Sequence, residues 1–212
     1  MSLLDDISKS IQDGDELKVT ELIQKALGES ICPETILREG LLAGIALVGE
    51  QFRENEVFVP EVLIAARAMN AGISVLKPLL MEQGMQGKGV AVIGTVKGDI
   101  HDIGKNLLKV MLEGKGLTVI DLGIEVSAES FIDEAIRSDA SVVCCSALLS
   151  TAMNEMKKVV ELAKTKGVRD NFKIMVGGAP VTQRFCDSIG ADYYSADATT
   201  AAEAALAFCA QR

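Results

Sequence analysis

The first part of the chain repeats apolar positions with the period of an α-helix. Four segments place apolar residues three and four positions apart, which gathers them on one helical face. The segments cover residues 3–11, 17–26, 37–52 and 62–76. Asp15 and Pro33 stand where a helix start favours a cap or a first-turn proline, and Pro60 heads the fourth segment. We therefore predict a bundle of four amphipathic helices.

The pattern changes near residue 85. Beyond it, continuous apolar runs alternate with helix-like segments. The runs cover residues 90–96, 117–122, 141–145 and 173–176, with a weaker one near 193–194; the helical segments cover 103–113, 128–137, 153–164, 182–188 and 199–210. Strands that are apolar throughout are typical of parallel sheets covered on both faces. We predict an α/β protein with a helical domain over residues 1–86 and a doubly wound, five-stranded parallel sheet over residues 87–212.

Three glycines, Gly84, Gly87 and Gly89, mark the boundary between the predicted domains. Together with the neighbouring glutamines and a lysine, they predict a short flexible joint.

Composition indicates an ordinary packed protein. Hydrophobic residues make up 49% of the chain and the mean hydropathy is +0.27, which is ample for a core. The sequence shows no leader pattern and no apolar run of membrane-spanning length, so we expect a cytoplasmic protein without a membrane partner. The five cysteines are odd in number and form no Cys-x-x-Cys pair, which argues against a disulfide framework or a zinc site.

The net charge of −9 is concentrated at the front, because residues 1–86 carry 14 acidic and 7 basic side chains. An acidic segment without a lysine or arginine face argues against nucleic acid as a partner.

The single histidine follows the first apolar run of the predicted sheet. His101 lies between Asp99 and Gly104 in the segment Gly-Asp-Ile-His-Asp-Ile-Gly. Ligands of doubly wound sheets collect beyond the carboxyl ends of the strands. A neutral imidazole binds transition metals, and its second ring nitrogen usually donates to a carboxylate, for which Asp99 is the candidate. Gly104 lacks a side chain, so a ligand can approach the backbone there.

Two further strand ends carry unusual residues. Ser146 and Leu148 follow the third run, and Gly177-Gly178 follow the fourth; 41 residues separate Gly104 from Ser146, and 28 separate Leu148 from Gly177. This set resembles the cobalamin-binding signature Asp-x-His-x-x-Gly, Ser-x-Leu, Gly-Gly. The resemblance covers residues 89–212 and implies a Rossmann-like, flavodoxin-like fold. This part of the chain is similar to the cobalamin-binding module of methionine synthase.

The resemblance implies a role for each part of the motif. His101 would be the lower axial ligand of cobalt, with Asp99 beside it, and the displaced base of cobalamin would lie by the Ser-x-Leu and Gly-Gly segments. The residues expected to contact the cofactor are Gly98, Asp99, His101, Asp102, Ile103, Gly104, Ser146, Leu148, Ser150, Thr151, Gly177 and Gly178. Methionine synthase has a relay serine where this chain has Ala152; Ser150 or Thr151 would have to substitute through water.

The helical domain also resembles a known element. Its stretch from Gly49 to Met69 is similar to the four-helix cap of corrinoid methyltransferase proteins, which covers the upper face of the corrin. Phe58, Val62, Ala65 and Met69 share one helical face and are candidates for contact with the cofactor. The alternative is that they form the core of the bundle.

These resemblances imply a methyl carrier. No barrel of about 250 residues is present to complete a reaction. A substrate-specific methyltransferase would methylate cob(I)alamin, and a second one would pass the group from methylcobalamin to tetrahydrofolate or a thiol. A reductive activator would be a further partner. Methanol, methylamines, betaines and aromatic methyl ethers are all possible donors, with a slight preference for O-demethylation.

Other functions would share parts of the pattern. A mutase subunit would bind cobalamin but need no cap, and a cobalamin-sensing regulator would add a basic DNA-reading domain. A flavodoxin-like signalling domain would need none of the motif.

Overall fold

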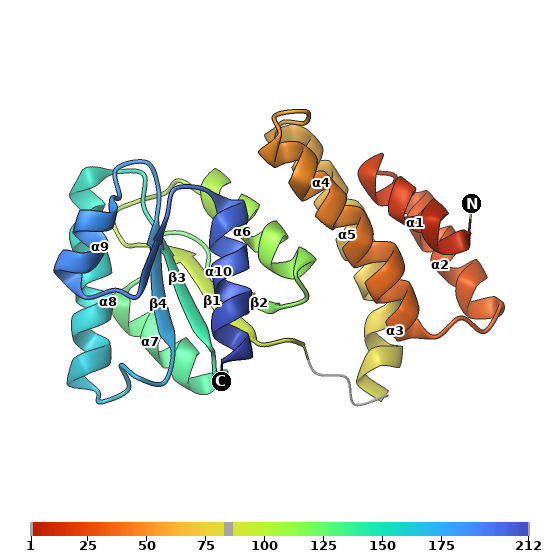
Figure 1. The fold of residues 1–212 in the computed structure, drawn as a ribbon. Helices are drawn as coiled ribbons and strands as arrows, with labels where there is room; N and C mark the ends of the chain where they lie inside the picture. Colours follow the sequence, from red (N-terminus) through yellow and green to blue (C-terminus); the bar gives the residue numbers. More distant parts are fainter. Residues whose placement is uncertain (1, 83–86, 212) are drawn as a thin grey trace. The chain divides into compact units, whose positions relative to one another are not determined.

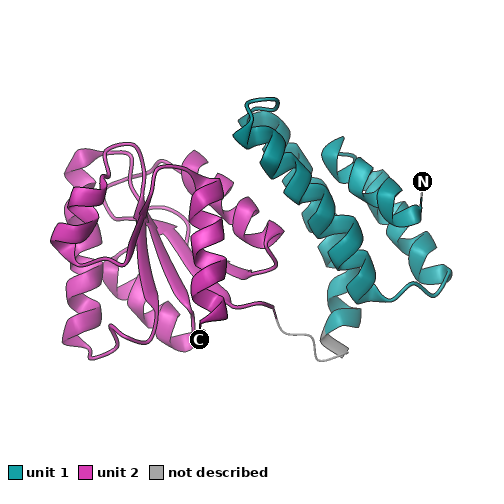
Figure 2. Cartoon of the chain, in the orientation of Figure 1, with its two compact units in different colours: residues 1–86 teal, residues 87–212 magenta. Residues whose placement is uncertain are grey.

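The chain divides into two compact units, residues 1–86 and residues 87–212 (Figure 2). The computed structural model describes residues 2–82 and 87–211. Gly84 of the predicted joint lies outside these residues. At Gly89 the surrounding atoms leave no room for a side chain, because a Cβ atom there would lie 2.6 Å from the Cys209 Sγ atom.

The first unit is helical, as predicted. Its elements are α1 (Leu3–Gln12), α2 (Glu16–Gly28), α3 (Pro33–Thr35), the π-helical segment η1 (Ile36–Leu42), α4 (Ala43–Arg53) and α5 (Val59–Glu82). The Asp15 side chain caps α2 by accepting from the Lys18 amide, and Pro33 lies in the first turn of α3. Both residues act as the sequence predicts.

The third predicted helix contains a change of helical type. Its stretch runs from α3 through η1 to α4, and Ile36 is fully buried whereas Leu37 is only partly buried. A π-helical turn takes up more residues than an α-helical turn, so it changes which residue faces the core. The apolar spacing does not reveal this segment.

One helix, α5, is long and apolar enough over Val59–Leu80 to cross a bilayer by length and composition alone. It packs against α1, α2 and α4, and its Met69 and Leu76 side chains are fully buried. We therefore interpret α5 as the core helix of the helical unit.

The second unit is a five-stranded, all-parallel sheet with the order β2-β1-β3-β4-β5 (Figure 1). The strands are β1 (Val90–Thr95), β2 (Thr118–Asp121), β3 (Val142–Ser146), β4 (Lys173–Gly177) and β5 (Tyr193–Ser195). They confirm the five predicted strands. The strand order reverses between β1 and β3, and this is where such sheets bind ligands.

Helices cover both faces of the sheet (Figure 1). They are α6 (Ile103–Gly114), α7 (Ala128–Arg137), α8 (Met153–Thr165), α9 (Gln183–Ile189) and α10 (Ala198–Ala210), with a short 3-10 turn, η2 (Ser150–Ala152), before α8. α6 packs with α10, and α7 packs with α8. The α7 and α8 side includes a core around Phe131, Ile132 and Met156, all fully buried.

Candidate functional site

The three parts of the histidine motif meet at one edge of the sheet. Thr95 at the end of β1 is in register with Ser146 at the end of β3, and Ser146 is in register with Gly177 at the end of β4. The Val96 amide donates to the Ser146 carbonyl, with 3.0 Å between nitrogen and oxygen. Segments separated by many residues in sequence therefore form one continuous edge at the reversal point of strand order.

Asp99 is fully buried and holds this edge together. Its Oδ1 atom accepts from the His101 amide at 3.0 Å and lies 2.8 Å from the His101 Nδ1 atom. Its Oδ2 atom accepts from the amides of Leu148 and Leu149, at 2.6 and 2.9 Å. One carboxylate thus joins the β1–α6 loop to the loop after β3.

These contacts fix the charge of Asp99. Burial by itself raises the pKa of the carboxyl, but the hydrogen bonds from His101, Leu149 and Leu148 outweigh it and lower the pKa to about 2. Asp99 is therefore ionised at neutral pH. Ala152, at the position of the relay serine in the methionine synthase pattern, is buried. In this chain the backbone amides of residues 148 and 149 donate hydrogen bonds to Asp99.

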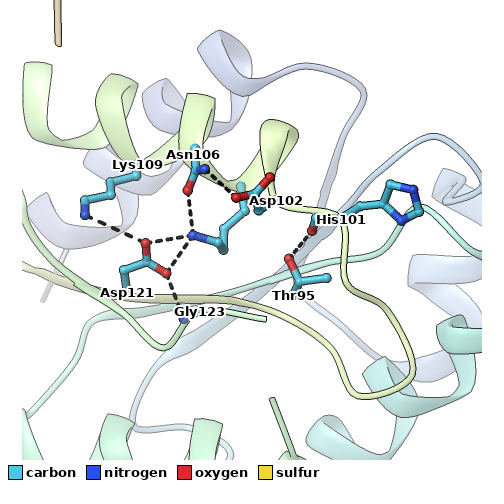
Figure 3. A network of polar contacts seen from close by, with 8 residues as sticks. Thr95, His101, Asp102, Asn106, Lys109, Asp121 and Gly123 are labelled. Carbon is cyan, nitrogen blue, oxygen red and sulfur yellow. Dashed lines mark hydrogen bonds and ion pairs between the residues drawn. The ribbon is translucent and has the colours of Figure 1, made fainter. Parts of the chain in front are cut away.

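The orientation of the imidazole follows from the charge of its partner. An ionised carboxylate can only accept, so His101 Nδ1 carries the proton of this hydrogen bond, and in the neutral ring Nε2 is then the nitrogen with the lone pair. The His101 side chain is 49% exposed, and its ring points away from the neighbouring polar network in Figure 3. The carbonyl of His101 accepts from the buried Thr95 hydroxyl at 2.7 Å. The loop thus presents an available imidazole nitrogen at the sheet edge.

The motif glycines differ in what surrounds them. Gly178 has φ +126°, and a Cβ atom there would lie 1.8 Å from the Ala147 carbonyl oxygen. Both the packing and the backbone conformation therefore require a glycine at this position. A Cβ atom at Gly104 would meet nothing within 4 Å, so the surface in front of the α6 N-terminus is open. Gly98 adopts φ +84° in the histidine loop.

Exposed apolar side chains gather in the loops around His101. Ile100 and Ile103 are 67% and 64% exposed, and Leu148 and Leu149 are 44% and 41% exposed. Their loops converge on Asp99 through the hydrogen bonds described above. Clustered apolar side chains of this kind mark ligand or partner sites. Ser150 and Thr151 are exposed in η2, next to the same loop.

Sequence reasoning missed Glu125, which also holds the histidine loop. Its Oε1 atom accepts from the Gly98 amide at 3.1 Å, and its own amide donates to the Asp99 carbonyl at 3.2 Å. Glu125 has φ +57°, an uncommon value for a residue with a side chain. No pattern in the sequence marks this conformation.

A second missed feature is a polar network behind the histidine loop (Figure 3). Asp102, the N-cap residue of α6, accepts from Asn106, and Asn106 accepts in turn from Lys105. Lys105 also pairs with Asp121 at the end of β2. The sequence feature that could have pointed to Asp121 is a charged residue at the end of an apolar run.

The four candidate contact residues of the helical unit lie in different surroundings. Val62, Ala65 and Met69 are fully buried, which fits the alternative that they form its core. Phe58 is 65% exposed. Its amide donates to Glu61 Oε2 at 3.0 Å, an arrangement typical of a helix start. Of the four proposed contact residues, only Phe58 presents its side chain to solvent.

The fold and the edge residues define a domain that presents a half-exposed imidazole at the reversal point of an all-parallel sheet. The family model described as "B12 binding domain" matches residues 89–207, and a second model of the same description matches residues 3–77. The chain belongs to this family of B12-binding proteins, and its cofactor is cobalamin.

Similar proteins cover nearly the whole chain. A corrinoid protein of Desulfitobacterium hafniense is 43% identical over 97% of this chain and 96% of its own length. The dimethylamine corrinoid protein of Methanosarcina barkeri is 42% identical over 94% of this chain and 93% of its own. The solved methanol:cobalamin methyltransferase complex of M. barkeri matches with a TM-score of 0.90 and 30% identity, over 99% of this chain and 80% of that chain.

The residues at the sheet edge fit this cofactor. His101 is hydrogen-bonded to Asp99 through Nδ1, so Nε2 is the ring nitrogen that would hold a metal, and Gly104 leaves open space at the start of α6. Ile100, Ile103 and Leu148 add apolar surface that a large, planar ring can cover. The fit rests on these side chains together rather than on the histidine alone.

Proposed function

We propose that the chain carries methyl groups between two methyltransferases, with His101 as the lower axial ligand of cobalt. The observation that carries this proposal is the pairing of His101 Nδ1 with the ionised, buried Asp99 at 2.8 Å, which leaves Nε2 available. When bound, cobalamin supplies a cobalt atom that can take up and release a methyl group. The His101 side chain, which is 49% exposed, would be accessible to the cobalt of a bound cofactor.

Each part of the motif has a task in this proposal. Asp99 orients the imidazole and stabilises positive charge on it whenever the ring takes up a proton. Ser146, Gly177 and Gly178 form the edge beside which the displaced base of cobalamin would lie. Gly98, Asp102, Ile103 and Gly104 form the loop and helix start next to the ring, together with Leu148, Ser150 and Thr151.

The partners follow from the relatives. Their names include dimethylamine and trimethylamine corrinoid proteins and a methanol:cobalamin methyltransferase complex. These names support a methyl carrier over a mutase subunit or a regulator, and they make methylamines and methanol the first donors to assay, before aromatic methyl ethers. A second methyltransferase that uses tetrahydrofolate or a thiol, and a reductive activator, complete the proposed system. We expect it to operate in the cytoplasm.

The test of the ligand is spectroscopic. The wild-type protein, loaded with cobalamin, should give the absorption spectrum of the histidine-bound form with the cofactor's own base displaced. His101→Ala should take up cobalamin and lack that spectrum. An unchanged spectrum in the variant would rule out His101 as the ligand.

The test of the carrier role is a transfer assay. Candidate methyltransferases should move the methyl group of a methylamine or methanol onto the loaded protein, and a second enzyme should remove it. Rearrangement of a substrate in the presence of adenosylcobalamin would instead favour the mutase alternative.

A further inference from the structure

Lys105 is a buried charge that the proposed function does not use. It lies in the first turn of α6, where the helix dipole disfavours a positive charge, and its side chain is only 4% exposed. Burying an ammonium group costs free energy unless every proton has a partner. A lysine in this position is unfavourable for the helix itself.

The surroundings of Lys105 compensate this cost. Its Nζ atom donates to both carboxylate oxygens of Asp121, at 2.8 and 2.7 Å, and to Asn106 Oδ1 at 2.7 Å. The three protons of the ammonium are thus all engaged. Asp121 Oδ1 also accepts from the Gly123 amide at 2.9 Å. Figure 3 shows Asn106, Asp121 and Gly123 as parts of one polar network.

The network links the histidine loop to β2. Asn106 Nδ2 donates to Asp102 Oδ2 at 3.0 Å, and Asp102 directly follows His101. Asp121 is paired with Ile93 of β1 across the sheet. The His101 carbonyl is fixed separately by the Thr95 hydroxyl. The end of the loop is therefore anchored to β1 on one side and, through Lys105, to β2 on the other.

We propose that Lys105 is a positioning residue, which holds the start of α6 against Asp121 so that His101 presents Nε2 to the cofactor. The inference rests on the proposed role of His101 as the cobalt ligand. Lys105 does not touch the ligand nitrogen; it acts through Asn106, Asp102 and the backbone between them.

The test compares Lys105→Met with Lys109→Met in the full-length, cobalamin-loaded protein. Lys109 is the matched control, because its Nζ atom is 3.7 Å from Asp121 Oδ2 and its side chain is 35% exposed. We expect Lys105→Met to lower the ratio of histidine-bound to histidine-free cobalt(II) about 10-fold, as loss of an outer hydrogen-bond partner typically does. Electron paramagnetic resonance reads this ratio from the nitrogen coupling. Lys109→Met should match the wild type.

A second measurement needs no cofactor. In the cofactor-free protein, Lys105→Met should speed amide hydrogen exchange over residues 98–106, and Lys109→Met should not. If the single variant folds poorly, Lys105→Met combined with Asp121→Asn also removes the carboxylate charge that the Lys105 ammonium had balanced. Ile132→Val, which weakens the core on the α7 and α8 side of the sheet, should leave both readings unchanged.

The outcomes separate the two proposals. A wild-type protein without nitrogen coupling would overturn the role of His101 itself. A wild-type protein with the coupling, together with a Lys105→Met variant whose ratio and exchange equal those of Lys109→Met, would overturn only the role of Lys105. An equal change in Ile132→Val would reduce Lys105 to a general contribution to stability, and would also overturn its positioning role.

Discussion

The Asp99 carboxylate accepts a hydrogen bond from the amide of Leu148, 2.6 Å away and 49 residues later in the chain. This contact connects the histidine loop with the loop after β3 through a single buried side chain. It makes the orientation of His101 depend on a second strand end.

Asp99→Asn should weaken the binding of His101 to cobalt. An amide group offers one acceptor oxygen instead of two, so its NH₂ group faces either the two backbone amides or the imidazole N–H. We expect the histidine-bound fraction to fall about 10-fold or more, measured from the absorption spectrum. Asp133→Asn on the exposed surface of α7 is the control. Equal spectra in the two variants would contradict the role of Asp99.

The stability of the protein should fall at acid pH in part because of Asp99. Its folded-state pKa of about 2 lies below the ordinary 3.8, so its contribution is present above pH 4 and is lost as the pH falls toward 2. We expect this loss to amount to about 2 kcal/mol of unfolding free energy. Urea unfolding of the cofactor-free protein at several pH values measures it. Asp99→Asn should show a shallower decline, and parallel curves would contradict the prediction.

Ala152→Ser tests whether a relay hydroxyl is needed. The Asp99 Oδ2 atom already accepts from two amides, and a hydroxyl at the buried position 152 must find its own partner. We expect the histidine-bound fraction to stay close to that of the wild type, while unfolding free energy decreases by about 1 kcal/mol. A large gain in the histidine-bound fraction would show that the backbone amides support Asp99 only incompletely.

Two glycine variants should act in opposite ways. Gly104→Ala places a methyl group in open space at the start of α6, so we expect it to stabilise the cofactor-free protein by about 0.5 kcal/mol and to weaken cobalamin binding. Gly178→Ala drives its Cβ atom into the Ala147 carbonyl at φ +126° and should destabilise by at least about 2 kcal/mol. Chemical denaturation and titration with cobalamin separate the two effects. Unchanged affinity in Gly104→Ala would remove that surface from the site.

The helical unit offers a similar pair. Phe58→Ala should leave the unfolding free energy nearly unchanged because the side chain is 65% exposed, whereas Val62→Ala should lower it by about 2 kcal/mol because the side chain is fully buried. If Phe58 shields the cofactor, its removal should also speed oxidation of the reduced, loaded protein by dioxygen. Oxidation at the wild-type rate would exclude Phe58 from a shielding role.

The sequence predicts most of the fold because burial leaves a clear pattern. Strands β1 and β3 are buried on both faces and read as continuous apolar runs, and the helix caps are visible as Asp15 and Pro33. The π-helical segment Ile36–Leu42 was not predictable in the same way. Its residues Leu37 and Leu41 keep the four-residue spacing of an ordinary helix.

The site was only partly predictable. His101 and Asp99 are visible because side-chain chemistry at a strand end is specific. The hydrogen bonds that residues 148 and 149 donate to Asp99 are not visible in the sequence, because they come from backbone amides and do not depend on the side chains. The role of Glu125 is not predictable from the sequence for a related reason, since its left-handed backbone conformation depends on the loop around it.

The double use of Asp99 means that one buried side chain sets two features of the sheet edge. Both carboxylate oxygens are engaged within the protein, so the hydrogen bond of His101 Nδ1 and the relative position of two loops depend on the same side chain. Contacts within the protein that order a binding surface reduce the conformational entropy that binding must remove. The affinity for cobalamin should accordingly depend on residues that never touch it, and stabilising the sheet edge should be a route to tighter binding.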